Sequence, residues 1–69
     1  MSLHVNDVRY NAQNGAFEAR VDIIADGAVF RYPCQVPGPL NMDFSRVRAG
    51  LERHAMRQSV QGAQLMSHL

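Results

Sequence analysis

Two stretches of alternating apolar and polar residues flank the dipeptide Asp26-Gly27, and together they predict a β-hairpin. An Asp-Gly loop of two residues favours a type I′ turn, whose positive φ angles suit Asp and Gly and whose twist matches the strands it joins. This turn predicts one register: Ala25 pairs with Ala28, Ile24 with Val29, Ile23 with Phe30, Asp22 with Arg31, Val21 with Tyr32 and Ala19 with Cys34. Because side chains alternate along a strand, one face of the hairpin is apolar. That face collects Phe17, Ala19, Val21, Ile23, Phe30, Tyr32 and Cys34.

The first stretch, residues 3–10, also predicts a strand, and Asn14-Gly15 is a second hairpin signal. A two-residue turn there would pair Ala12 with Phe17, Tyr10 with Ala19 and Val8 with Val21. Further out, the same register would turn the polar residues His4 and Asn6 to the apolar face. One extra residue reverses the alternation beyond it, so we predict a β-bulge near Asn6-Asp7.

Pro33 sets the order of the three strands. Proline has no N–H to donate to a sheet, so the third strand is expected at an edge and the second strand in the centre. The order is then 1-2-3, an antiparallel meander over about residues 3–36. Pro37-Gly38-Pro39 ends the sheet and begins a linker over 37–41.

A helix is predicted over about residues 42–59. Phe44, Val47, Leu51 and Ala55 recur at steps of three and four and form a narrow apolar stripe. Asn41 or Asp43 is placed to cap the helix. The tail, residues 60–69, either continues the helix or is mobile. We therefore predict a single small α+β domain over 1–69, with a β-β-β-α order and the helix packed on one face of the sheet.

Composition narrows the class of protein. The 69 residues, 46% of them hydrophobic, can build one small core. Domains of this size often gain stability from metals, disulfides or a partner subunit. Cys34 is the sole cysteine and lies on the apolar face, where we expect a small hydrophobe and not a reactive thiol. An unpaired cysteine, with no secretion signal and no apolar run of membrane-spanning length, indicates a cytoplasmic protein without a membrane partner.

One face of the predicted helix carries the candidate interaction surface: Arg46, Gly50, Arg53 and Arg57. Glycine costs about 1 kcal/mol relative to alanine inside a helix, so Gly50 suggests the close approach of another backbone or a phosphate. The arginines beside it suit carboxylates or phosphates. The alternative is a solvated basic face with one tolerated glycine. On the interaction hypothesis, Gly50→Leu disrupts assembly and leaves the isolated fold nearly intact.

The opposite face of the sheet is less promising. Its charges nearly cancel, and it has no aromatic residue to stack on bases. Its expected members are Asp7, Arg9, Glu18, Arg20, Asp22 and Arg31, with the apolar pair Ile24 and Val29. The net charge of the chain is only +1. Binding of nucleic acid, through the helix arginines, therefore remains the alternative function and not the leading one.

Catalytic and metal-binding patterns are sparse. His4, His54 and His68 lie in separate segments without metal-ligand spacing. Cys34 with His54 is the one nucleophile and base combination that the fold could bring together. We expect no enzyme activity, no metal and no cofactor. The small core and the open sheet edges favour an interaction module whose partner is a second copy of the chain or a larger protein.

Overall fold

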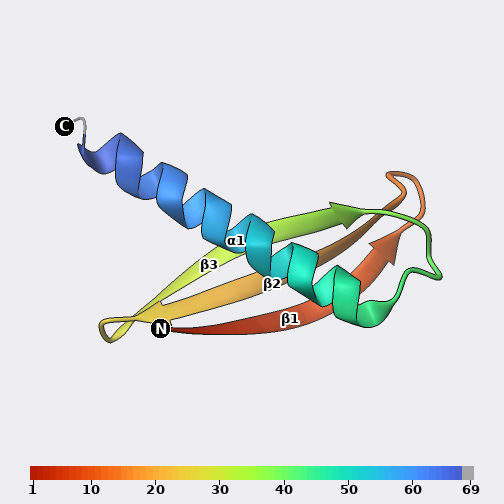
Figure 1. Cartoon of the computed structure of the whole chain (residues 1–69), viewed down its shortest axis with the longest axis horizontal. Coiled ribbons are helices and arrows are strands. Elements are labelled where there is room, and N and C mark those ends of the chain that lie inside the picture. Colours follow the sequence, from red (N-terminus) through yellow and green to blue (C-terminus); the bar gives the residue numbers. More distant parts are fainter. Residues whose placement is uncertain (68–69) are drawn as a thin grey trace.

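Asp26 and Gly27 adopt positive φ angles of 53° and 76°, and this turn joins β2 (Ala16–Ala25) to β3 (Ala28–Pro37). The computed structural model describes residues 1–67, with side chains described for residues 1–60. Every predicted pair of this hairpin is confirmed. With β1 (Ser2–Asn11) and a C-terminal helix, the strands form an antiparallel sheet in the order β1-β2-β3 (Figure 1). The predicted α+β class, strand order and edge position of Pro33 are therefore confirmed.

The predicted register of the first hairpin is wrong by two residues. Tyr10 pairs with Phe17, and Asn11 pairs with Ala16, so the loop has four residues and not two. The side chain of Asn11 explains the longer loop, because its Oδ1 accepts hydrogen bonds from the N–H groups of Gln13 and Asn14, at 3.0 and 3.3 Å. A shift of two residues leaves every side chain on its predicted face.

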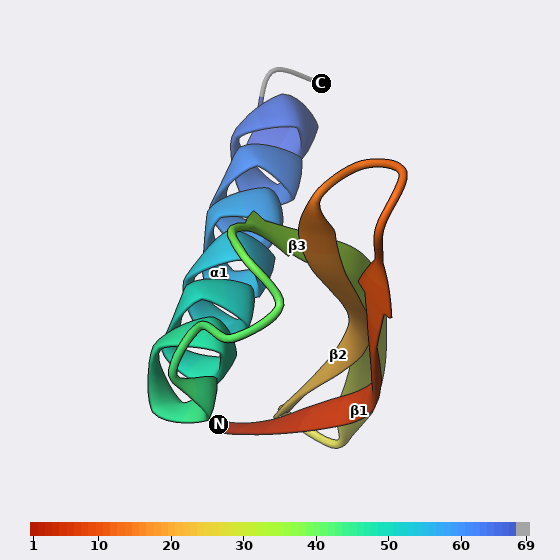
Figure 2. The same ribbon diagram turned by 90° about the vertical axis from the view of Figure 1, so that its right-hand side faces the viewer.

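The predicted bulge in β1 is confirmed. The register shifts between Asn6 and Arg9, and Asp7 adopts a φ of 57°. Asn6 pairs with Arg20 and Arg9 with Glu18, so two residues of β1 lie opposite one residue of β2. The extra residue directs the first half of β1 toward the core, and the sheet curls around the helix (Figure 2).

Asp43 is the residue that caps the helix α1 (Phe44–Ser67). Its backbone carbonyl accepts the N–H groups of Arg46 and Val47, and its carboxylate accepts the N–H of Ser45 at 3.3 Å. The helix thus starts two residues later than predicted. Of the two conformations expected for the tail, the helical one holds for the backbone as far as Ser67, and residues 68–69 lie outside the described part.

The core lies between α1 and the inner face of the sheet. Val47, Leu51 and Ala55 are fully buried. They pack with four sheet residues: Phe17, Val21, Ile23 and Cys34. Figure 1 shows α1 crossing the strands diagonally, from the β1 side at its start to beyond β3 at its end.

Phe44 does not join this core, although the predicted stripe includes it, and its side chain is 58% exposed. Helical side chains lean toward the N-terminus, and Phe44, as the first residue of α1, has no preceding turn to cover. Phe30 is on the predicted face but is 49% exposed. It lies three residues beyond Gly27, at the end of the sheet that the diagonal helix does not cover (Figure 1).

Candidate functional site

Gly50 faces the sheet and not an external partner. A Cβ added at Gly50 would lie 2.8 Å from Cγ2 of Val36 and 3.3 Å from its Cγ1, both closer than ordinary packing allows. The close approach that the sequence suggested is therefore real, but it is made with β3 of the same chain. This contact argues against the expectation that Gly50→Leu leaves the fold nearly intact, because a larger side chain would push α1 away from β3.

A groove of about 590 Å³ runs beside Gly50, between α1 and the segment that follows β3. Its lining consists of Val36, Pro39, Asn41, Met42, Asp43, Arg46, Ala49, Gly50 and Arg53. Three members of the predicted interaction surface therefore share one groove. The fourth, Arg57, is exposed and lies one turn further along the helix, outside this lining.

Hydrogen bonds hold the outer wall of the groove, residues 38–43, against the first hairpin. Gly38 donates its N–H to the carbonyl of Gly15 at 2.9 Å, and the hydroxyl of Tyr10 donates to the carbonyl of Gly38 at 3.0 Å. Met42 donates its N–H to the carbonyl of Pro39 at 3.0 Å. The wall is thus fixed to the sheet on one side and to the helix cap on the other.

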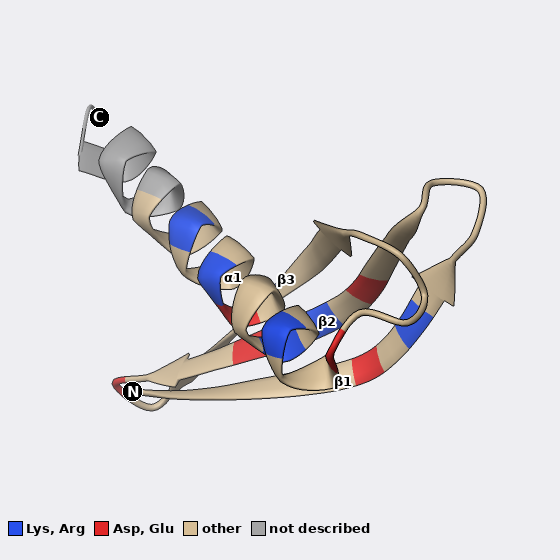
Figure 3. Cartoon of the chain, turned by 45° about the vertical axis from the view of Figure 1, so that its right-hand side comes forward, with Lys and Arg blue, Asp and Glu red and all other residues tan. Residues whose placement is uncertain are grey.

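The arginines of the predicted surface keep their charge available. Among the described side chains, Arg46, Arg53 and Arg57 form no ion pair. The ion pairs that do form join Arg20 to Asp7, Arg31 to Asp22 and Arg48 to Glu52. The carboxylate on the groove wall, that of Asp43, is already engaged by the hydroxyl of Ser45 at 2.8 Å. Figure 3 shows the basic positions recurring along the described part of α1.

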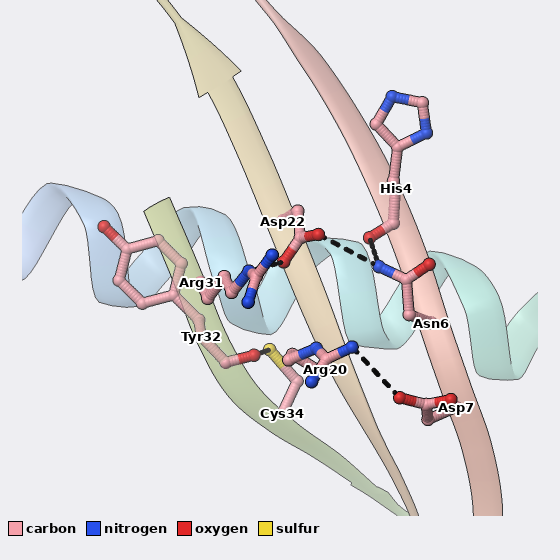
Figure 4. Close-up of polar contacts among 8 residues, drawn as sticks. All are labelled: His4, Asn6, Asp7, Arg20, Asp22, Arg31, Tyr32 and Cys34. Atoms are coloured by element: carbon pink, nitrogen blue, oxygen red, sulfur yellow. Dashed lines mark hydrogen bonds and ion pairs between the residues drawn. The ribbon is translucent and has the colours of Figure 1, made fainter. Parts of the chain in front are cut away.

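The outer face of the sheet neutralises its own charges. Asp22 accepts a hydrogen bond from the side-chain amide of Asn6 at 3.2 Å, and its other oxygen lies 3.5 Å from Nε of Arg31 (Figure 4). Arg20 and Asp7 pair at 3.1 Å. Arginines and carboxylates of this face line a hollow of about 640 Å³, together with Cys34 of the inner face and His54 of α1. This arrangement lacks the excess of positive charge that a phosphate backbone requires.

The proposed nucleophile and base, Cys34 and His54, line the same hollow but form no hydrogen bond with each other. Cys34 is 4% exposed, and its thiol donates to the carbonyl of Tyr32 at 3.5 Å. Burial raises the pKa of the Cys34 thiol above its ordinary value of 9.0, which is opposite to the shift that a nucleophile needs. His54 uses its Nδ1 to accept the backbone N–H of Gln35 at 3.0 Å. The predicted role of Cys34 as a buried hydrophobe is confirmed.

The described part of the chain has neither a metal-binding cluster nor a helix that could span a membrane. No group of three or more His, Cys, Asp or Glu residues there is placed to hold a metal ion. Nor does α1, so far as it is described, have the length and apolar character needed to cross a membrane.

The sequence did not reveal that the helix closes the outer edge of β3. In a two-residue hairpin the pair next to the turn, here Ala25 and Ala28, exchanges hydrogen bonds between its backbone groups. Every second residue of β3 from Val29 to Pro37 therefore directs its backbone groups away from β2. Pro33 and Pro37 at these positions have no N–H. The N–H of Gln35 is bonded to His54, and the carbonyl of Pro33 accepts Nε2 of Gln58 at 2.9 Å. The N–H groups at this end of the edge are thus all absent or bonded.

The outer edge of β1 has no such cover within the described residues. The residues of β2 form their backbone hydrogen bonds alternately with β3 and with β1. Residues 2, 4 and 6 of β1 therefore direct their backbone groups toward β2, whereas Leu3 and Val5 direct their N–H and C=O groups away from the sheet. No described group bonds to these outward groups. The segment 2–6 contains neither proline nor Asp, Glu, Lys or Arg. The β1 edge at residues 2–6 and the β3 edge at residues 33–37 therefore differ in their protection.

Comparisons of the chain with protein-family models, with curated proteins and with solved structures find no match. Function is therefore inferred from the geometry of the chain itself.

Proposed function

We propose that the protein is a self-associating interaction module, in which β1 of one copy pairs with β1 of a second copy. The observation that carries this proposal is the difference between the two sheet edges. Proteins generally protect edge strands with prolines, charges, bulges or covering elements, because an open edge templates pairing with another chain. Residues 33–37 of the β3 edge have prolines and helix side chains, whereas residues 2–6 of β1 have neither.

The pairing fits the symmetry of a dimer. A two-fold axis through His4 places Leu3 beside Val5 of the partner subunit, and both residues direct their backbone groups outward. The product is a continuous antiparallel sheet of twice three strands, with the two helices on the same face. The bulge at Asp7 bends β1 and limits the pairing to its first half.

Charge and size both favour a second copy as the partner. Self-pairing of residues 2–6 brings no charged carboxylate or arginine against its own kind. A small domain also gains most from enlarging its sheet, because its single core buries little surface. The helix arginines would repel their counterparts in a second copy, so they do not suit this contact.

Sedimentation equilibrium across the micromolar range tests the proposal with two matched variants. His4→Lys adds a charge to an exposed side chain of β1 on the outer face of the sheet, and Val29→Lys adds one to an exposed side chain of the edge strand β3. We expect the native chain to approach twice 7.7 kDa with increasing concentration. His4→Lys should weaken association roughly fivefold, because like charges facing each other on paired strands cost up to about 1 kcal/mol. Val29→Lys should associate as the native chain does.

Two outcomes would refute β1 pairing. One is a native chain that stays monomeric throughout the concentration range. The other is association that is weakened by Val29→Lys and not by His4→Lys, which would assign the contact to the β3 edge.

We also propose a cytoplasmic location. A lone buried thiol needs no oxidising compartment, and reducing compartments are where such cysteines persist. Fractionation of cells that express the tagged chain checks this placement, and recovery from the culture medium or periplasm would contradict it.

A further inference from the structure

We propose that the groove between α1 and residues 38–43 binds an acidic segment of another protein, whose carboxylates pair with Arg46 and Arg53. This inference goes beyond self-association and does not depend on it, because the groove and the β1 edge use different residues.

The two arginines supply the charge that the partner must complement. Both are exposed, line the same groove and have no ion-pair partner among the described side chains. The carboxylate of Asp43 accepts hydrogen bonds from the hydroxyl and N–H of Ser45, at 2.8 and 3.3 Å, and forms no ion pair with either arginine. Guanidinium groups bind carboxylates through two parallel hydrogen bonds, which gives such a pair its direction as well as its strength.

The rest of the lining indicates a peptide. Val36, Met42 and Ala49 form an apolar stretch of the groove, and the missing side chain of Gly50 keeps the helix close to β3 beneath it. A surface of this kind accepts an aliphatic side chain flanked by acidic residues. Nucleic acid fits less well, because no aromatic residue lines the groove to stack on a base. A second copy is disfavoured by repulsion between like arginines.

The groove is also formed before any partner arrives. Tyr10 and Gly15 bond to Gly38, and the helix cap fixes the other end of the wall. A preformed site loses less conformational entropy on binding than one that must be ordered by its ligand.

Fluorescence anisotropy with a labelled peptide of alternating glutamate and leucine tests the inference. A peptide with glutamine in place of glutamate and a labelled single-stranded oligonucleotide are run beside it. Arg46→Gln and Arg53→Gln remove the groove charges one at a time, and Arg48→Gln is the matched control, since Arg48 lies on the same helix and pairs with Glu52 at 3.9 Å. The native chain and the three arginine variants are also measured with His4→Lys added. This comparison separates a loss of self-association from a loss of peptide binding in the groove.

We expect the acidic peptide to bind and the glutamine peptide not to bind. Each groove variant should lose roughly fivefold in affinity, the upper range for a solvent-exposed ion pair, whereas Arg48→Gln should keep the native affinity. Absence of acidic-peptide binding, or an equal loss in Arg48→Gln, would overturn the inference. Tighter binding of the oligonucleotide than of the peptide would also overturn it and would assign the arginines to nucleic acid.

Discussion

Cys34 shows at the scale of one residue how burial changes chemistry and creates a testable dependence on pH. Desolvation in the core disfavours the thiolate, so the pKa of Cys34 in the folded chain lies above 9.0. Well below pH 9.0 the thiol is protonated in both states and adds no pH dependence. As the pH rises above 9.0, the unfolded chain loses this proton first, and the stability of the fold decreases until the folded thiol also ionises.

We therefore predict that the free energy of unfolding of the native chain falls between neutral pH and pH values above 9.0, and that Cys34→Ala falls less. Urea denaturation at a series of pH values measures both chains. Cys34→Ala also loses packing in the core, which lowers its stability at every pH, so the comparison concerns the slopes of the two curves. Parallel curves would show that Cys34 titrates alike in the folded and unfolded states.

At the scale of elements, the fit between α1 and β3 depends on Gly50. Helix propensity alone predicts that Gly50→Ala stabilises the chain by about 1 kcal/mol. The added Cβ would lie 2.8 Å from a methyl of Val36, a β-branched residue with little rotamer freedom. We predict that Gly50→Ala lowers stability by about 1 kcal/mol, as overpacking commonly does, in a urea denaturation experiment.

A double-mutant cycle identifies the cause. In a Val36→Ala background the obstructing methyls are gone, so Gly50→Ala should become stabilising. If Gly50→Ala has the same effect in both backgrounds, the contact with Val36 does not limit the approach of the helix.

His54 offers a second prediction at this scale, because it closes the β3 edge. Replacing it by alanine leaves the N–H of Gln35 open to solvent, so the amide hydrogen of Gln35 should exchange at least several-fold faster in the folded chain. Hydrogen exchange followed by nuclear magnetic resonance measures this directly. Arg57→Ala, an exposed change on the same helix, is the control and should leave the exchange of Gln35 unaltered.

The elements also show which parts of the fold could be predicted. The pairing of β2 with β3 follows from the Asp26-Gly27 turn, because the register depends on two adjacent residues. The first hairpin was missed by two residues because the side chain of Asn11 selects a longer loop. The contact between Gly50 and β3 could not be predicted, because helical spacing gives the angles of residues around the helix axis and not the distance from the helix to the sheet. The bonds from His54 and Gln58 to β3 depend on where the helix crosses the sheet, which local patterns do not encode.

At the scale of the whole molecule, the two proposed contacts lie on different elements and depend on different forces. The β1 edge offers backbone hydrogen bonds from an uncharged segment, whereas the groove offers arginines. A dimer that forms through β1 therefore leaves both grooves available, one in each subunit. The dimer would present two separate sites for acidic segments, and linking two such segments in one partner would raise the apparent affinity.

Ionic strength separates these two contacts in a single preparation. Screening shortens the range of exposed charge interactions from about 10 Å at 0.1 M salt to about 3 Å at 1 M, while hydrogen bonds between strands are little affected. We predict that added sodium chloride weakens binding of the acidic peptide several-fold and leaves the sedimentation mass of the protein unchanged. If the mass also falls with salt, charged groups and not the β1 backbone hold the copies together. The helix arginines would then have to be assigned to the contact between subunits, since Arg46, Arg53 and Arg57 are exposed and form no ion pair among the described side chains.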